Sequence, residues 1–247
     1  MAENVLPLLN SCKKELWLPQ KDMPNQLLYC GKYTSPCKGN DCRGIVVISH
    51  GYTENAEKYR EVIYYFLKMG YHVYIPEHCG HGRSYRLSKD LFLVHIDTYE
   101  RYVDDLLSVA YQAKTDYGRL PVYLYGHSMG GGIAAAAVAA KPHLFEKAVL
   151  TSPMIRPDTR PLPWKLAGFL AAAACFLGKG TCHLPGGRPF DDTETFEVSS
   201  AASRPRFDCQ QQLRREQPLF QNTCGTYQWT QSAAKLHQFL MRTGWKQ

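Results

Sequence analysis

The feature that most constrains this chain is a serine bracketed by two glycines, placed between a strand-forming run and a helix-forming run. Residues 122–125 read Val-Tyr-Leu-Tyr, too short and too rich in β-branched and aromatic side chains for a helix. Residues 133–140 are mostly alanine, the strongest helix former. Between them, residues 126–130 read Gly-His-Ser-Met-Gly, the spacing of a nucleophile elbow. The sequence therefore predicts a strand, a sharp turn and a helix, with Ser128 at the turn.

Ser128 is the candidate nucleophile in this arrangement. The flanking glycines let the backbone make a strained turn, so that the hydroxyl stands clear of the sheet. The backbone N–H of Met129, at the start of the helix, would face a tetrahedral oxyanion. One alternative stays open, a Gly-Ser loop in which Ser128 only caps a core helix. A phosphate-binding P-loop is excluded because no Lys-Ser or Lys-Thr follows the glycines.

An earlier apolar run supplies a second candidate part of the site. Residues 44–49 read Gly-Ile-Val-Val-Ile-Ser, which is typical of a strand buried on both faces of a parallel sheet. Gly51 allows the loop after this strand to bend toward its neighbour, so the backbone N–H of Tyr52 is the second candidate oxyanion donor. His50 is expected to be a structural histidine, because the base of such a site follows the nucleophile in the chain.

Helix and strand patterns alternate through the first 151 residues. Helical spacing at residues 59–69 is followed by Gly70 and a strand at 71–75, and a second helix is predicted over 98–113 before the serine turn. A further strand follows at 147–151, so an α/β fold with a mostly parallel sheet is predicted. Residues 80–84, Gly-His-Gly-Arg-Ser, are interpreted as a structural loop, since no helix opens on three spaced glycines.

Composition limits the class of protein and its partners. With 247 residues and 45% hydrophobic content, the chain can form one domain with an insertion. Its net charge of +7 is scattered, so no nucleic-acid partner is expected, while contact with an anionic membrane surface remains open. No apolar run reaches the roughly 20 residues that span a bilayer. The oligomeric state is not determined by these features.

The nine cysteines favour a reduced, cytoplasmic protein, with or without peripheral membrane contact. Their number is odd, the chain is large and no signal peptide is recognised, unlike in small disulfide-rich secreted proteins. Cys30, Cys37 and Cys42 lie close together but lack the paired spacing and histidine partners of a structural zinc site. We therefore expect no metal site.

Four motifs together resemble those of the lysophospholipase and monoacylglycerol lipase group of the α/β hydrolases, which also carries the serine aminopeptidase label. They are residues 50–54 with a tyrosine at 59, residues 80–84, residues 126–131 and residues 152–154. The resemblance covers about residues 26 to 240.

The resemblance implies an α/β-hydrolase fold and an esterase acting on small monoacyl lipids through an acyl-enzyme, without a cofactor. Ser128 matches the family nucleophile, and Tyr52 and Met129 match its oxyanion positions. Glu77 and Cys79 stand where the family usually shows an aspartate and an arginine. This departure concerns the hydrogen bonds of the 80–84 loop.

The resemblance also divides the chain into a hydrolase core, residues 1–154, and a helical cap region, residues 155–247. Residues 166–177 are apolar almost all round. We expect this run to form a helix buried under the cap, near the entrance above Ser128, with exposure to lipid as the alternative.

No acid or base of a triad is identified. In this fold both follow the nucleophile and the cap. Yet no aspartate occurs after Asp208, and His237 is the only late histidine, in a predicted cap helix where a surface position is expected. The sequence therefore predicts a truncated hydrolase that lacks its C-terminal strands, exposes a sheet edge and has impaired turnover. A peptidase of the serine aminopeptidase class and a non-catalytic lipid-binding remnant are the alternatives.

Overall fold

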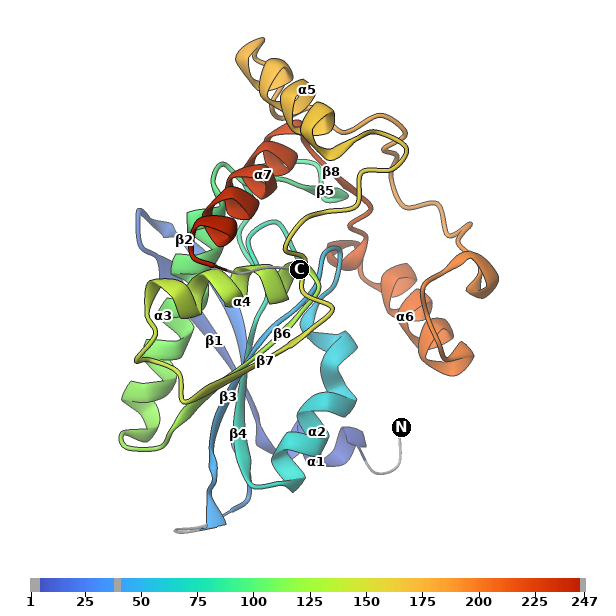
Figure 1. Cartoon of the computed structure of the whole chain (residues 1–247). Helices are drawn as coiled ribbons and strands as arrows, with labels where there is room; N and C mark the ends of the chain where they lie inside the picture. The colour runs from blue at the N-terminus through green and yellow to red at the C-terminus, as the bar shows by residue number, and fades with distance from the viewer. Residues whose placement is uncertain (1–4, 38–40, 245–247) are drawn as a thin grey trace.

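The computed structural model describes residues 5–37 and 41–244, which form a β-sheet with helices on both faces (Figure 1). The strands are β1 (Lys13–Gln20), β2 (Met23–Tyr33), β3 (Gly44–Ser49), β4 (Tyr71–Pro76), β5 (Leu93–Val94), β6 (Val122–His127), β7 (Lys147–Thr151) and β8 (Cys224–Gly225). The α-helices are α1 (Val5–Cys12), α2 (Arg60–Lys68), α3 (Tyr99–Tyr117), α4 (Met129–Ala140), α5 (Trp164–Phe176), α6 (Arg204–Glu216) and α7 (Tyr227–Arg242). Short 3₁₀ turns are η2 (Ala56–Tyr59), η3 (Phe196–Val198) and η4 (Pro218–Phe220).

The main sheet has six strands in the order β1-β2-β4-β3-β6-β7. β3, β4, β6 and β7 run parallel, and the antiparallel pair β1 and β2 extends the sheet beyond β4. β3 is buried along its whole length, as its continuous apolar sequence predicts for a central strand. The predicted α/β fold with a mostly parallel sheet is confirmed.

Each face of the sheet has its own hydrophobic cluster. On one face α1 and α2 pack against side chains such as Val46, Ile48 and Val73. On the other face α3 and α4 cover residues such as Ile45 and Val47, and α7 adds Trp229, Ala233 and Leu236 to the same cluster. Helix α7, distant in sequence, thus lies against the helix that begins at Ser128.

Strand β7 is an edge of the main sheet, as the sequence predicts. Within the described residues it pairs with β6 alone, and Lys147, Ala148 and Val149 are exposed. Val149 keeps 58% of its surface accessible although it is a β-branched apolar residue. The outer edge therefore offers unpaired backbone groups beside an apolar side chain.

Helix α5 contradicts the prediction that residues 166–177 are buried. It packs on α7 but stands away from the rest of the chain (Figure 1), and only Ala171 is buried. Phe169 is 68% exposed and Phe176 is 91% exposed. The burial prediction is wrong because one neighbouring helix can cover only one side of a helix that is apolar all round. No described helix has both the length and the apolarity that crossing a bilayer requires.

The start of α4 lies in close contact with the end of β3, and glycine makes this contact possible. A Cβ added to Gly130 would lie 2.1 Å from the carbonyl oxygen of Ser49 and 2.4 Å from that of His50. Both atoms belong to the backbone of a buried strand end, so neither can move away cheaply.

Gly130→Ala should therefore lower the free energy of unfolding by about 2–4 kcal/mol, despite the better helix propensity of alanine. Gly168→Ala in α5 is the matched control. Its Cβ would meet Ala234 at an ordinary 3.8 Å, so it should stabilise the protein by about 0.5–1 kcal/mol. Urea denaturation of both variants measures this difference, and equal effects would contradict the packing argument.

Candidate active site

Ser128 lies between β6 and α4 in a strained backbone conformation. Its φ is 51° and its ψ is −120°, a combination that side chains rarely adopt. Its carbonyl accepts hydrogen bonds from the N–H groups of Gly131, Gly132 and Met154, at 2.8 to 3.2 Å, and its own N–H donates to Thr151. The Ser128 side chain makes no capping hydrogen bond. The turn therefore holds the hydroxyl away from the helix instead of using it as a cap.

The loop after β3 approaches Ser128 closely. A Cβ added to Gly51 would lie 3.3 Å from Ser128 Cβ, so the loop backbone passes directly beside the nucleophile candidate. Among the hydrogen bonds of the described residues, none uses the N–H of Tyr52. The N–H of Met129 is the first of α4, where a helix has no internal acceptor. The two predicted oxyanion donors thus lie on neighbouring loops, and their assignment remains a prediction.

Three fully buried histidines support this loop from below. Nδ1 of His50 donates to the Gly51 carbonyl at 2.8 Å, while its Nε2 accepts from the His78 N–H at 2.9 Å. His81 Nε2 accepts from the Thr53 N–H at 3.3 Å. Burial lowers the pKa of His50 from 6.5 to about 4, and burial also lowers those of His78 and His81. His50 is therefore a neutral structural residue, as predicted.

The 80–84 loop is well bonded despite its departure from the family pattern. The buried Glu77 carboxylate accepts from the N–H of Ala56 at 3.1 Å and from the N–H of Arg83 at 2.6 Å. The Arg83 guanidinium adds a bond to Glu77 at 2.9 Å and a second to Glu57 at 2.5 Å. Glu77 thus ties the 80–84 loop to η2, and Cys79 is buried in the apolar core.

The hydroxyl oxygen of Ser128 has no hydrogen-bond partner among the described residues. His127, its neighbour, bonds Thr151 Oγ1 through Nδ1 at 3.0 Å and directs Nε2 toward Glu54 at 4.0 Å. His237 lies in α7, half-buried, where its Nδ1 donates to the carbonyl of Ile155 at 3.0 Å. No described imidazole is hydrogen-bonded to Ser128, so the candidate nucleophile has no hydrogen-bonded base among the described residues.

Ser128 opens into a chamber of about 630 Å³ between the loop after β3 and helix α6. No residue of α5 lines it, so the expected place of α5 beside the entrance above Ser128 is wrong. Residues 199–203 and one face of α6, which includes Phe207 and the buried Gln211, occupy that position instead.

The charges on the chamber wall neutralise one another. Its four glutamates each lie within 3.3 Å of a basic side chain, as the pairs Glu54–Lys58, Glu57–Arg60, Glu61–Arg206 and Glu194–Arg214. The Arg206–Glu61 pair, at 2.6 Å, links α6 to α2. The chamber wall therefore carries little net charge.

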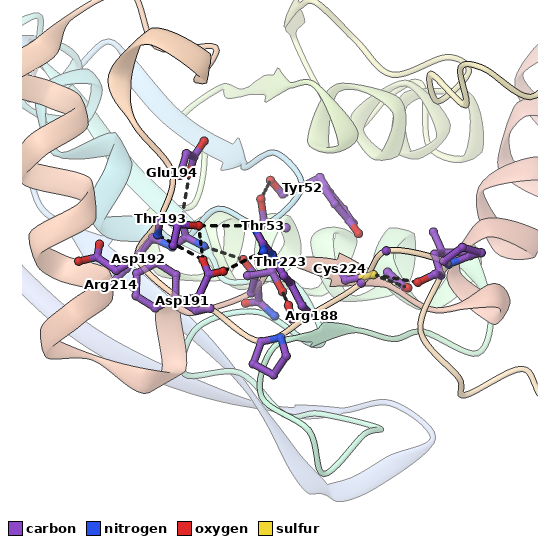
Figure 2. A pocket seen from close by; sticks show the side chains of 18 of the residues that line it. Tyr52, Thr53, Arg188, Asp191, Asp192, Thr193, Glu194, Arg214, Thr223 and Cys224 are labelled. Carbon is purple, nitrogen blue, oxygen red and sulfur yellow. Dashed lines mark hydrogen bonds and ion pairs between the residues drawn. The ribbon is translucent and has the colours of Figure 1, made fainter.

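A second chamber of about 670 Å³ also borders the loop after β3, and Figure 2 shows residues that line it. Tyr52, Thr53, Glu194 and Arg214 line both chambers, but Ser128 lines only the first. Residues 184–194 form much of the second wall. Its charged groups are again paired internally, as in Arg188–Asp191 at 3.2 Å.

Two cysteines near the N-terminus form a disulfide, which corrects the expectation of reduced thiols for this pair. Cys37 and Cys42 have Cα atoms 5.3 Å apart because the ends of the link between β2 and β3 meet there. With His72 they form a group of possible metal ligands within 4.8 Å of one another. The sulfurs are joined in a disulfide, however, and Nδ1 of His72 accepts from the Ser35 N–H. Metal ligation needs thiolates, so these residues do not fit a metal site in this state.

A strained serine between strand and helix, at the carboxyl edge of a mostly parallel sheet, defines an α/β hydrolase. The chain belongs to the family described as serine aminopeptidase, S33, whose model matches residues 40–233.

Relatives and solved structures agree with this family. The chain is 35% identical over 159 residues to a monoacylglycerol lipase of Mycolicibacterium smegmatis, covering 64% of this chain and 52% of the relative. It is 36% identical over 110 residues to lysophospholipase L2 of Escherichia coli, covering 44% of this chain and 32% of the relative. The chain thus spans about half or less of the length of these relatives.

The fold resembles the structure of a soluble variant of monoglyceride lipase from Saccharomyces cerevisiae in complex with a substrate analogue. The TM-score is 0.69 at 15% identity, covering 94% of this chain and 71% of that chain. At this identity the likeness shows the fold alone.

The buried histidines should make the protein sensitive to mild acid. Nε2 of His50 must stay unprotonated to accept from the His78 N–H, so the folded state resists protonation to about pH 4, whereas the unfolded chain takes up a proton near pH 6.5. The unfolded state binds more protons between these values. The free energy of unfolding should therefore fall by roughly 3 kcal/mol from pH 6.5 to pH 4 through His50 alone. Urea denaturation across this range measures the slope.

His143→Asn, in an exposed position, is the control and should leave the slope unchanged, whereas His50→Asn should flatten it. Equal slopes in all three proteins would contradict the assignment of His50.

Proposed function

We propose that this chain is a serine hydrolase of the monoacylglycerol lipase and lysophospholipase type, which cleaves acyl esters through an acyl-enzyme on Ser128. The observation that carries the proposal is the strained turn at Ser128 beside the unpaired N–H of Tyr52 and the helix start at Met129. In this proposal residues 1–154 form the hydrolase core and residues 155–247 the cap region.

The proposal includes slow turnover by residues 1–247 alone. A serine hydroxyl is a weak nucleophile unless a base removes its proton. Because no described side chain bonds Ser128 Oγ, what remains is the oxyanion site and substrate binding, which give on the order of 10³ to 10⁴ over water.

The wall of the Ser128 chamber supports a neutral headgroup over a charged one. Each of its glutamates is paired with a basic side chain, so no carboxylate is free to attract an ammonium group and none of these paired basic side chains is free to attract a phosphate. A charged headgroup would have to break one of these pairs or lie unpaired, which costs free energy. Monoacylglycerol is therefore the preferred substrate in this proposal.

Helix α5 supports contact with a membrane surface, where a monoacyl lipid resides. Its exposed apolar residues are flanked by Lys165 and Lys179, which suit an anionic lipid surface. No residue of α5 lines the Ser128 chamber, so in this proposal α5 does not bind the acyl chain there.

The family description as a serine aminopeptidase supports a peptidase as an alternative function. The lack of an acid and a base bonded to Ser128 in the described residues supports a non-catalytic lipid-binding protein as another. Release of a long-chain acid from monoacylglycerol, measured beside release of an arylamine from an aminoacyl arylamide, separates the two enzyme classes. Lipid binding without either activity would favour the lipid-binding remnant.

Ser128→Ala should abolish covalent labelling by a fluorophosphonate and any ester hydrolysis, with no loss of folding. The change removes one oxygen that has no hydrogen-bond partner among the described residues. Mass spectrometry of the intact protein measures the adduct, and circular dichroism checks the fold. Labelling of the alanine variant at the wild-type rate would place the nucleophile elsewhere.

Replacing Phe169 and Phe176 by serine should weaken binding to vesicles of mixed neutral and anionic lipid by at least about tenfold. Each ring that leaves the lipid forfeits about 1.5–3 kcal/mol of apolar burial. Vesicle sedimentation measures the binding. Tyr65→Ser, an exposed aromatic on α2, is the control and should have no effect. Equal vesicle binding by all variants and the wild type would contradict a role of α5 in membrane contact.

A further inference from the structure

We propose that Glu54 is a positioning residue that fixes the distance between the two oxyanion donors, the N–H groups of Tyr52 and Met129. This inference rests on the proposed function for its catalytic meaning. The hydrogen bonds by which Glu54 holds the loop after β3 do not depend on the proposed function. Glu54 lines the Ser128 chamber, but in the described residues its carboxylate accepts from Gly51, Lys58 and Tyr59 and not from Ser128.

Glu54 closes the loop after β3 onto its first residue. Oε2 of Glu54 accepts from the N–H of Gly51 at 2.7 Å, while the N–H of Glu54 donates to the carbonyl of Gly51 at 3.3 Å. Both backbone groups of Gly51 are therefore held by the same residue. The peptide that follows carries the Tyr52 N–H, so its direction depends on this double contact together with the bonds that His50 Nδ1 makes to the Gly51 carbonyl at 2.8 Å and that the Tyr59 hydroxyl accepts from the Gly51 N–H at 3.3 Å.

The carboxylate is itself held in place by two donors. The Tyr59 hydroxyl donates to the same oxygen, Oε2, at 2.6 Å, and Lys58 Nζ lies 2.5 Å from Oε1. The Glu54 side chain is only 9% exposed. A charged, buried acceptor with fixed donors forms stronger hydrogen bonds than a neutral or mobile one.

The second carboxylate oxygen faces the elbow. Oε1 of Glu54 lies 4.0 Å from Nε2 of His127, the residue before Ser128. Glu54 thus lies between the loop that carries Tyr52 and the turn that leads to Met129. The space between Glu54 and Ser128 admits no side chain at position 51. A Cβ added to Gly51 would lie 2.7 Å from Glu54 Oε2 and 3.3 Å from Ser128 Cβ.

Glu54 is poorly suited to be the missing base. Burial alone would raise the pKa of its carboxyl, but Lys58 and the Tyr59 hydroxyl hold it below its ordinary value. A carboxylate with a lowered pKa is a weak base at neutral pH. Its oxygens are also occupied by the Gly51, Tyr59 and Lys58 donors. The geometry therefore assigns it to positioning.

The test compares Glu54→Ala and Glu54→Gln with wild type by two measurements. Hydrogen–deuterium exchange of peptides covering residues 50–55 reports the hold on the loop, and the rate of fluorophosphonate labelling reports the site around Ser128. Glu54→Ala should speed exchange of the 50–55 amides about tenfold and slow labelling about tenfold, since each charged hydrogen bond is worth about one factor of ten or more. Glu54→Gln keeps one acceptor oxygen and the side-chain volume, so both effects should be smaller.

Glu146→Gln, an exposed glutamate before β7, is the matched control and should change neither measurement. Faster exchange confined to residues 50–55, together with slower labelling, supports the proposal. Slower labelling without faster exchange overturns it, and so does faster exchange that spreads through β3 and α4, which indicates a general structural role. If wild type is not labelled at all, the proposed function fails, while the exchange data alone still show whether Glu54 holds the loop.

Discussion

The candidate site depends on one close contact, between the first turn of α4 and the end of β3. Gly130 has no side chain, so the helix backbone rests directly on the carbonyl oxygens of Ser49 and His50. This contact fixes the helix start, and the three N–H groups that bond the Ser128 carbonyl hold the turn in its strained conformation. A residue with such a φ costs of order 1–3 kcal/mol and persists only when its surroundings determine it. At Ser128 these surroundings are the packed end of β3 and the N–H groups that bond the Ser128 carbonyl.

Beneath the loop after β3, buried polar residues take the place of apolar packing. His50, His78 and His81 are fully buried and neutral, and Glu77 is buried against Arg83. Such groups are costly unless their hydrogen bonds are made. Most of these hydrogen bonds join the buried polar side chains to backbone groups of loops that have no regular secondary structure. The polar cluster therefore fixes the shape of these loops, because hydrogen bonds are directional and apolar contacts are not.

Helices α5 and α6 differ in where they lie. α6 lines the Ser128 chamber, and the pair of Arg206 and Glu61 ties it to α2. α5 packs mainly on α7 and leaves Phe169 and Phe176 exposed. The polar helix therefore faces the candidate nucleophile and the apolar helix faces outward, the reverse of what hydrophobicity alone suggests. The exposed edge of β7 is a second outward surface, next to the strand that carries the elbow.

The sequence by itself determined the local structure around Ser128 and the class of fold. Runs of apolar residues, glycine spacing and helix propensity act over a few residues, so the strands β3 and β6, the turn and helix α4 could be predicted without a structure. The same local signals placed His50 as a structural residue, because its position after an early strand is wrong for a base. The exposed edge at β7 followed from the same reasoning about which strands the chain contains.

Only the tertiary structure decided which surfaces meet. The apolar character of residues 166–177 indicated burial, but burial requires neighbours, and in the described part of the chain α7 is the main element packed against that helix. No periodic pattern in the sequence predicts that Arg206 meets Glu61, that Cys37 meets Cys42 or that the Glu54 carboxylate holds Gly51. Local propensity fixes the elements, whereas the contacts between loops depend on where the packed sheet and helices leave them.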